Sequence, residues 1–258
     1  MPRIARKKSE TNLYHVMLRA INRQDIFLDH EDRQRFINTL VRFKTKSGYK
    51  IYGYCLMTNH IHLLIQTGEE DIALVMKRIN VSYVHWYNNK YERAGHLFQD
   101  RYKSEAVLDD AYFMTVLRYI HQNPLKAGLV LKLSEYAWSS YNDYLHGDGN
   151  LVNVEYVLNL FHHNKQEALK NFIRFMNQKN DDRCLDDFEI SRKKWSADEV
   201  ADLLYEICGI RDVNKISTFS KQKRDRVILD LRDRGLTIRK LAEITGLGRG
   251  VIERVTRR

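Results

Sequence analysis

The order of strand-like and helix-like segments in residues 12–123 limits the folds that this chain can adopt. Apolar residues alternate or run continuously in the strand-like segments and recur every three or four positions in the helical ones. Strands are predicted at 12–21, 49–57, 60–66 and 104–108, and helices at 29–46, 71–93 and 109–123. The order β-α-β-β-α-β-α is that of the split β-α-β arrangement. We therefore expect an α+β, ferredoxin-like fold: a four-stranded antiparallel sheet with two helices on one face, followed by an added helix.

The rest of the chain is expected to be helical. Residues 130–195 contain the aromatic anchors of further short helices, and the polar stretch 177–187 is interpreted as a linker. Helices are also predicted at 222–234, 237–245 and 249–255, and the last two flank a Gly246-Leu247-Gly248 turn, as in a helix-turn-helix. The expected domains are 1–130 with the sheet, 131–190 as helical extension and linker, and 191–258 as the helix-turn-helix domain.

The charge of the chain favours a polyanionic partner, and nucleic acid above all. Lys and Arg outnumber Asp and Glu by 43 to 33, giving a formal net charge of +10 and a pI near 9.4. Residues 215–258 alone hold 13 basic and 5 acidic residues. The candidates for phosphate or groove contacts there are Arg239, Lys240, Arg249 and Arg254. The alternatives are a merely basic protein and helix faces that are simply solvated.

Cysteine content and hydropathy indicate a soluble, cytoplasmic protein. Cys55, Cys184 and Cys208 are odd in number and widely spaced, so neither a disulfide framework nor a four-cysteine zinc site is predicted. No stretch approaches the roughly 18 apolar residues of a membrane span. We expect no membrane association.

Two histidines, His60 and His62, flank Ile61 at the start of a predicted buried strand. Side chains alternate across a strand, so both imidazoles project from the same face. Two neutral imidazoles a few ångströms apart can hold a divalent metal ion. Histidines at this spacing are also often hydrogen-bonded core or surface residues, and the pair alone does not decide between these readings.

Tyr119 and Asn123 lie one turn apart in the helix predicted at 109–123. Pro124 disfavours the α conformation at the residue before it, so we expect the pair to occupy the last turn of this helix. A phenol can attack a phosphodiester whose charge a metal neutralises, and His60, His62 and the amide oxygen of Asn123 can supply three ligands for Mg²⁺ or Mn²⁺. Alternatively, Tyr119 is one of fifteen tyrosines and only packs an amphipathic helix.

Several motifs spaced over residues 12–130 occur together and in order. They are Tyr14-His15-Val16, Asn22-Arg23, Asn59-His60-Ile61-His62-Leu63-Leu64-Ile65, Phe98-Gln99-Asp100-Arg101-Tyr102-Lys103 and Tyr119-Ile120-His121-Gln122-Asn123-Pro124-Leu125-Lys126-Ala127-Gly128. With these motifs the chain resembles the IS200-like single-tyrosine transposases of the HUH (histidine-hydrophobe-histidine) superfamily. Asn123, where insertion-sequence members often have glutamine, resembles the REP-associated tyrosine transposases.

The resemblance implies a metal-dependent DNA nickase and strand transferase. In this reading His60 and His62 bind the metal, Asn123 completes the coordination, and Tyr119 is the nucleophile that forms a 5′-phosphotyrosine next to a single-stranded DNA hairpin. Arg101, Lys103 and Lys126 lie near these segments in sequence and are candidates for holding the single strand. Insertion-sequence relatives suggest a homodimer with shared active sites, although a long C-terminal extension can equally shield that surface.

Two other functions remain open at this point. One is a DNA-binding regulator of repeated palindromes that keeps the fold but has lost transposition. The other is a related single-tyrosine nickase that initiates replication or plasmid transfer.

Overall fold

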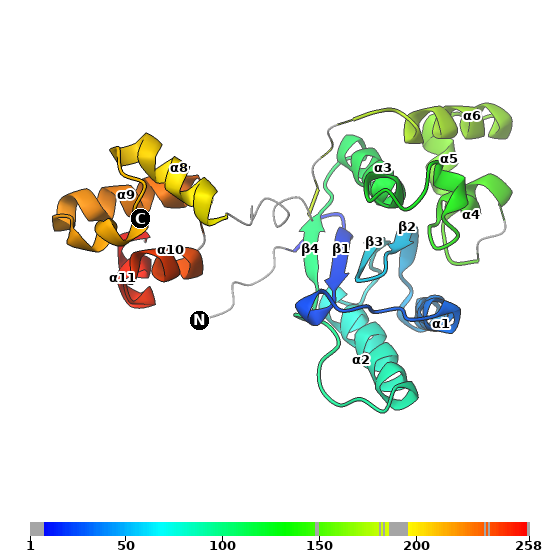
Figure 1. The fold of residues 1–258 in the computed structure, drawn as a ribbon. Helices are drawn as coiled ribbons and strands as arrows, with labels where there is room; N and C mark the ends of the chain where they lie inside the picture. The colour runs from blue at the N-terminus through cyan, green and yellow to red at the C-terminus, as the bar shows by residue number, and fades with distance from the viewer. Residues whose placement is uncertain are drawn as a thin grey trace. The chain divides into compact units, whose positions relative to one another are not determined.

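The computed structural model describes residues 8–147, 150–180, 182, 184–185, 196–234, 236 and 238–256. The chain divides into two compact units, residues 1–185 and 186–258 (Figure 1). Each unit has its own cluster of buried apolar side chains. No helix among the described residues is both long enough and apolar enough to span a membrane.

The first unit is built on a four-stranded antiparallel sheet. Its strands are β1 (Leu13–Arg19), β2 (Lys50–Leu56), β3 (His60–Gln66) and β4 (Lys103–Ala106), in the order β2-β3-β1-β4. All three pairings are antiparallel. The predicted α+β class, the four-stranded sheet and the element order are confirmed.

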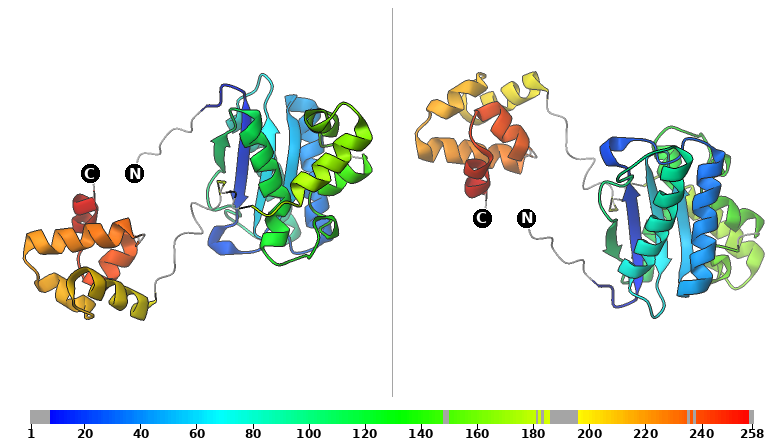
Figure 2. Two further views of the ribbon diagram at one scale, coloured as in Figure 1. Left: turned by 90° about the horizontal axis from the view of Figure 1, so that it is seen from above. Right: turned by 90° about the horizontal axis from the view of Figure 1, so that it is seen from below.

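Helices cover both faces of the sheet. Figure 2 shows α3 (Asp110–Lys126) over one face when seen from above, and α1 (His30–Ser47) and α2 (Ile72–Lys90) over the opposite face when seen from below. The five central residues of β3 are accordingly all buried, which explains why this strand is nearly continuous in apolar residues. The two helices expected on one face are therefore present, and the added helix closes the other face.

Local signals fix the ends of the helices. The side chains of Asp29, Asp71 and Asp109 accept backbone N–H bonds at the first turns of α1, α2 and α3. Helix α1 ends at Gly48, whose φ of 65° lies in the left-handed region that glycine adopts easily.

The predicted end of α3 at Asn123 is wrong. The helix continues through Pro124 to Lys126, and the Ala127 N–H donates to the Asn123 carbonyl. Because Pro124 lies in the last turn, its ring removes only one intrahelical hydrogen bond, and the turn that follows closes with Gly128 at a φ of 69°. Tyr119 and Asn123 thus both lie within regular helix.

Within the first unit, the helical extension packs against the sheet. It contains α4 (Tyr141–His146), α5 (Val154–Phe161) and α6 (Lys165–Met176), preceded by a short 3-10 helix, η2 (Leu133–Glu135). Backbone bonds attach it to β2: Leu56 N–H donates to Trp138, Ser140 to Tyr54, and Asn153 to Ile51. These bonds cover one edge of the sheet, which would otherwise offer unpaired backbone groups to another strand.

The second unit is helical, with α8 (Ala197–Cys208), η3 (Val213–Thr218), α9 (Lys221–Asp233), α10 (Ile238–Thr245) and α11 (Arg249–Thr256). The last three correspond to the helices predicted at 222–234, 237–245 and 249–255. Residues 246–248 connect α10 to α11, with Gly246 at a φ of 66°. The buried side chains of Leu231, Leu241 and Ile252 belong to one core, so α9, α10 and α11 pack together.

Candidate active site

Three histidines share the sheet face that α3 covers. His62 pairs with Met17 and His60 with Arg19, and paired residues in an antiparallel sheet project from the same face. His15 lies two residues before Met17 in β1 and therefore projects from that face as well. His15 and His62 are fully buried, whereas His60, the first residue of β3, is partly exposed.

Hydrogen bonds orient two of these rings. His15 Nε2 lies 2.9 Å from His62 Nδ1, and His60 Nδ1 lies 2.7 Å from the amide oxygen of Asn59. Since an amide oxygen only accepts, His60 donates from Nδ1 and carries its lone pair on Nε2. If His62 likewise donates from Nδ1 to His15, its own lone pair is also on Nε2. In metal sites the ligating histidines are oriented by such bonds from the second ring nitrogen.

Helix α3 brings Tyr119 against the histidines. The centroid of the Tyr119 ring is 5.7 Å from that of His62 and 5.9 Å from that of His15, and the His60 and His62 centroids are 5.1 Å apart. Gly53 of β2 assists this packing, since a Cβ there would come within 2.6 Å of Leu117 Cδ1 on α3. Tyr119 is only 3% exposed.

Asn123 follows Tyr119 by one turn. Its Nδ2 donates weakly to the Tyr119 carbonyl, at 3.5 Å, so the amide oxygen is the atom that can accept or ligate. The structure thus places His60, His62 and Tyr119 in one ring cluster, with Asn123 one turn further along α3.

The donor chemistry of this cluster fits a divalent metal ion. Two imidazole nitrogens and one amide oxygen form the mixed set that manganese accepts readily and magnesium less so. Among the described residues no group of three or more His, Cys, Asp or Glu side chains could hold a metal. If His60 and His62 hold a metal ion, a third protein ligand from the described residues would be of another residue type, such as the Asn123 amide.

The residues between Tyr119 and Asn123 point elsewhere and hold α3 in place. His121 is 1% exposed, its Nε2 lies 2.8 Å from Ser140 Oγ, and burial lowers its pKa to about 3. Gln122 donates from Nε2 to the carbonyls of Met176 and Gln178. His121 and Gln122 thus tie α3 to the helical extension.

The stretch expected to be a linker, 177–187, also contacts α3 in its described part. Arg118 binds the Asp182 carboxylate through two bonds of 2.7 and 3.0 Å, and Cys184 is fully buried. Asp186 and Asp187 lie outside the described residues. The described part therefore packs on the helix that carries Tyr119.

The three cations predicted to hold a single strand lie at different places. Lys126 Nζ is 5.2 Å from the Tyr119 ring centroid. Lys103 pairs with Met17, which pairs with His62, so Lys103 lies in the same cross-strand row as the histidine face, about 10 Å from His62. Arg101, in contrast, lines a groove beside α2.

The cations predicted for the second unit lie on α10 and α11. Arg249 is the first residue of α11 and is exposed, as is Arg254 near its end. Lys240 forms a 2.9 Å ion pair with Glu243 on α10, which offsets part of its charge. The side chain of Arg239 lies outside the described part of the structure.

Sequence reasoning missed His15 as a site residue, although it stands in one of the motifs. The missing signal was register: only the pairing of Met17 with His62 brings His15 to the same face. It also missed Arg118 and Gln122 as the residues that fix α3, because their partners lie more than 50 residues away.

Comparisons with known proteins agree with this fold. The family described as "Transposase IS200 like" matches residues 8–123. A Haemophilus influenzae protein, provisionally named a REP-associated tyrosine transposase, is 26% identical over 106 residues, which cover 36% of this chain and 60% of that protein. The chain thus spans about 60% of that relative's length.

A solved structure shares the fold of the first unit. It is described as a REP-associated tyrosine transposase bound to a REP hairpin, and it superposes with a TM-score of 0.50. The match has 18% sequence identity and covers 58% of this chain and 90% of that one. At this sequence identity the match supports a shared fold alone.

Proposed function

We propose that this chain, whose residues 8–123 match the IS200-like transposase family, is a metal-dependent single-strand DNA endonuclease and strand transferase of the REP-associated type. The observation that carries the proposal is the packing of Tyr119 against His62, with the two ring centroids 5.7 Å apart. A tyrosine next to a pair of potential metal ligands is the arrangement that phosphodiester attack by a phenol requires.

His60, His62 and Asn123 would hold the metal ion, which when bound neutralises charge on the scissile phosphate. The hydrogen bonds of His62 Nδ1 with His15 and of His60 Nδ1 with the Asn59 oxygen would keep both imidazoles oriented toward it. Burial of Tyr119 at 3% exposure limits the access of water that would compete as the nucleophile.

The chemical step is a transesterification. The Tyr119 oxygen forms a bond to the phosphorus, and the bond from the phosphorus to the 3′-oxygen breaks with its electron pair leaving on that oxygen. The phenolic proton balances the step by ending on the 3′-oxygen, directly or through solvent. The products are a 5′-phosphotyrosine and a free 3′-hydroxyl, and attack by a 3′-hydroxyl on the phosphotyrosine reverses the step and joins strands.

The second unit is proposed to bind DNA through a helix-turn-helix. Support comes from the order α10, turn, α11 and from exposed Arg249 at the start of α11, the position from which recognition helices contact DNA. The proposed substrate is a hairpin flanked by single-stranded DNA, and the description of the solved structure, in which that protein is bound to a REP hairpin, supports the hairpin. A homodimer stays a prediction, and gel filtration with light scattering measures it.

The test is incubation of the full chain with end-labelled hairpin DNAs, with Mg²⁺, with Mn²⁺ and with chelator. We expect a denaturation-resistant protein–DNA adduct that needs metal and is absent from Tyr119→Phe. Tyr112→Phe is the matched control, because Tyr112 lies on the same helix but binds Glu105 at 2.7 Å.

The other outcomes separate the remaining functions. Cleavage that persists in Tyr119→Phe would contradict the proposed nucleophile. Tight, salt-sensitive binding without cleavage of any hairpin tried would favour the regulator, and a preference for an origin over a dispersed palindrome would favour the replication or transfer initiator.

A further inference from the structure

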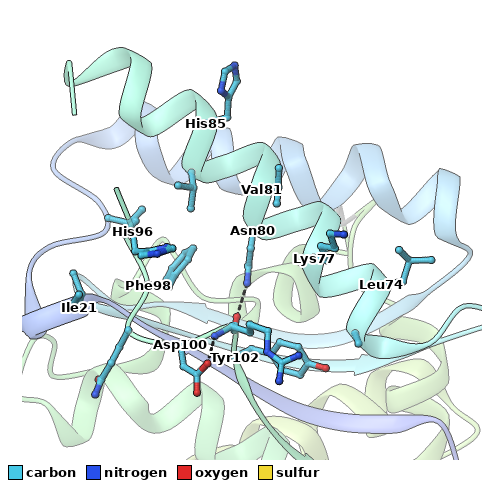
Figure 3. Close-up of a pocket in the computed structure, with 15 residues that line it drawn as sticks. Ile21, Leu74, Lys77, Asn80, Val81, His85, His96, Phe98, Asp100 and Tyr102 are labelled. Carbon is cyan, nitrogen blue, oxygen red and sulfur yellow. Dashed lines mark hydrogen bonds between the residues drawn. The ribbon is translucent and has the colours of Figure 1, made fainter. Parts of the chain in front are cut away.

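A groove of about 960 Å³ lies on the α2 side of the first unit, away from α3. Figure 3 shows α2 along one side, with Leu74, Lys77, Val81 and His85 spaced along it, and the segment bearing His96, Phe98, Asp100 and Tyr102 on the other. This volume is at the upper end of the range for pockets that hold small ligands. The residues proposed for the chemistry do not line it.

The groove combines apolar surface with cations. Val81 is 61% exposed and Leu74 is 42% exposed, and these two large apolar side chains lie two turns apart along α2. Lys77 and Arg101 are exposed, and neither forms a salt bridge within the described part of the chain. The one carboxylate in the lining, on Asp100, accepts the Arg101 N–H at 2.7 Å. Positive charge therefore exceeds negative charge around an apolar floor.

The two walls are fixed to each other. Asn80 Nδ2 on α2 donates to the Arg101 carbonyl at 2.6 Å, as the dashed line in Figure 3 marks, and Asn88 Nδ2 donates to the Gly95 carbonyl at 3.1 Å. On the sheet side, Ile21 N–H donates to Leu97. The groove is thus formed before any ligand binds, which lowers the entropy cost of binding.

The groove begins close to the candidate active site. Gln99, which lines it, donates its backbone N–H to Arg19, and Arg19 pairs with His60. Two strand spacings therefore separate the segment of Gln99 from His60, or about 10 Å. A few nucleotides of extended single strand can cover that distance.

We propose that this groove binds unpaired bases of the single-stranded DNA that flanks the cleavage point. Apolar side chains contact base faces irrespective of sequence, and Lys77 and Arg101 neutralise the neighbouring phosphates. The inference rests on the proposed function, since it concerns the same DNA. A nucleic-acid strand accounts for the uncompensated cations, which an apolar peptide would leave unpaired.

The experiment measures the affinity of the full chain for two hairpin DNAs. One extends a single nucleotide beyond the cleavage point, so that the scissile phosphodiester is present, and the other has six further single-stranded nucleotides on each side. The variants are Val81→Glu and the pair Lys77→Gln with Arg101→Gln. Leu160→Glu, which changes a 40% exposed leucine of α5 in the same way, is the matched control.

We expect the wild type and Leu160→Glu to bind the longer DNA more tightly than the shorter one. In the groove variants this gain in affinity should be about tenfold smaller, as expected for one lost contact to a base. All these proteins should bind the short hairpin equally and form the Tyr119 adduct on it. In addition, Val81→Cys should cross-link to a thiol-modified nucleotide in the flank, whereas Leu160→Cys should not.

The proposal would be overturned if the longer DNA raised the affinity equally in the groove variants and the wild type. Cross-linking of Leu160→Cys as strong as that of Val81→Cys would also overturn it. Self-association of the wild type that Val81→Glu abolishes, with no effect on DNA affinity, would overturn it in favour of a second copy. Loss of the Tyr119 adduct on both DNAs in the wild type would instead contradict the proposed function, because binding in the groove is read from affinity alone.

Discussion

Two buried histidines, His62 and His121, lie on opposite sides of Tyr119 and show that burial alone does not indicate a site. His62 is fully buried and His121 is 1% exposed. His62 has the polar neighbours His15 and His60, and the Tyr119 ring, around it. His121 instead contacts the rings of Tyr141, Tyr144 and Phe172 and hydrogen-bonds a serine.

The chemistry of the neighbours therefore separates the two regions. An imidazole among other nitrogen and oxygen donors can bind a metal, whereas an imidazole enclosed by aromatic rings is kept neutral and serves packing. The same helix, α3, holds both regions: Tyr119 contacts the histidines of the sheet, and His121 contacts the extension. One motif in the sequence thus has a proposed catalytic part and a structural part.

A crossed pair of substitutions tests whether the two histidine regions are separate. His60→Ala should lower the rate of hairpin cleavage by about 10³-fold or more, because it removes a proposed metal ligand, and should leave the melting temperature nearly unchanged. His60 is preferred to His62 because it is partly exposed at a strand end. Cleavage rates at saturating Mn²⁺ and thermal unfolding are the two measurements.

The reciprocal variant, His121→Ala, should lose about 2–4 kcal/mol of unfolding free energy through a cavity and a lost hydrogen bond. Below its melting temperature it should still form the Tyr119 adduct. Loss of cleavage in a folded His121→Ala, or normal cleavage in His60→Ala, would show that the two regions are not separate.

The pH dependence of stability tests whether His121 is kept neutral in the folded chain. Burial lowers the pKa of His121 to about 3. His121 therefore binds a proton near pH 6.5 in the unfolded chain but stays neutral at that pH in the folded chain. The His121 contribution is therefore fully present above pH 6.5 and is lost as the pH falls, at about 1.4 kcal/mol per pH unit until pH 3. His121→Gln, which cannot titrate, should lack this slope in denaturant unfolding at pH 7, 6 and 5.

Asp143 acts in the opposite direction. Burial raises its pKa to about 6, so the folded chain takes up this proton first and gains stability as the pH falls from 6 towards 4. Because Asp143 is present in both proteins, the difference between wild type and His121→Gln isolates His121. Equal slopes in the two proteins would mean that His121 is not kept neutral by the core.

The sequence predicted the elements of the first unit well and its contacts poorly. Period-two and period-3.6 patterns are local, and they located all four strands and the three main helices. The error at Pro124 came from taking the residue before a proline as the end of the helix, although a proline in a last turn costs few hydrogen bonds. The placement of Arg101 beside α2 and Lys103 in register with Met17 needed the sheet pairing, which the sequence does not contain.

Polar contacts between distant segments were the hardest to predict. The polar stretch 177–187 suggested a linker, yet Gln178 and Asp182 in its described part bind Gln122 and Arg118 of α3. A polar side chain looks the same in the sequence whether it contacts water or a partner about 60 residues away. For the same reason His15 could be recognised as a motif residue but not as a neighbour of His62.

His15 offers a smaller test of how the histidine region works. His15→Phe removes the partner of His62 Nδ1 at 2.9 Å and should weaken Mn²⁺ binding about 10- to 100-fold by freeing the ring to reorient. Isothermal titration calorimetry measures this without DNA. Tyr14→Phe is the control from the adjacent, opposite-facing position and should bind Mn²⁺ like the wild type. Unchanged affinity in a folded His15→Phe would limit His15 to packing.

Lys126 gives the smallest expected effect and tests whether the region extends to the exposed end of α3. Its Nζ is 5.2 Å from the Tyr119 ring centroid, where its charge can attract the phosphate of a bound strand. Lys126→Gln should slow adduct formation by less than about tenfold, because an exposed charge contributes on the order of 1 kcal/mol. It should also reduce by about one the slope of the logarithm of the DNA affinity against the logarithm of the salt concentration. Lys165→Gln, an exposed lysine of α6, should change neither quantity. If both variants behave alike, Lys126 contributes only to the general positive charge, and the site ends at Asn123.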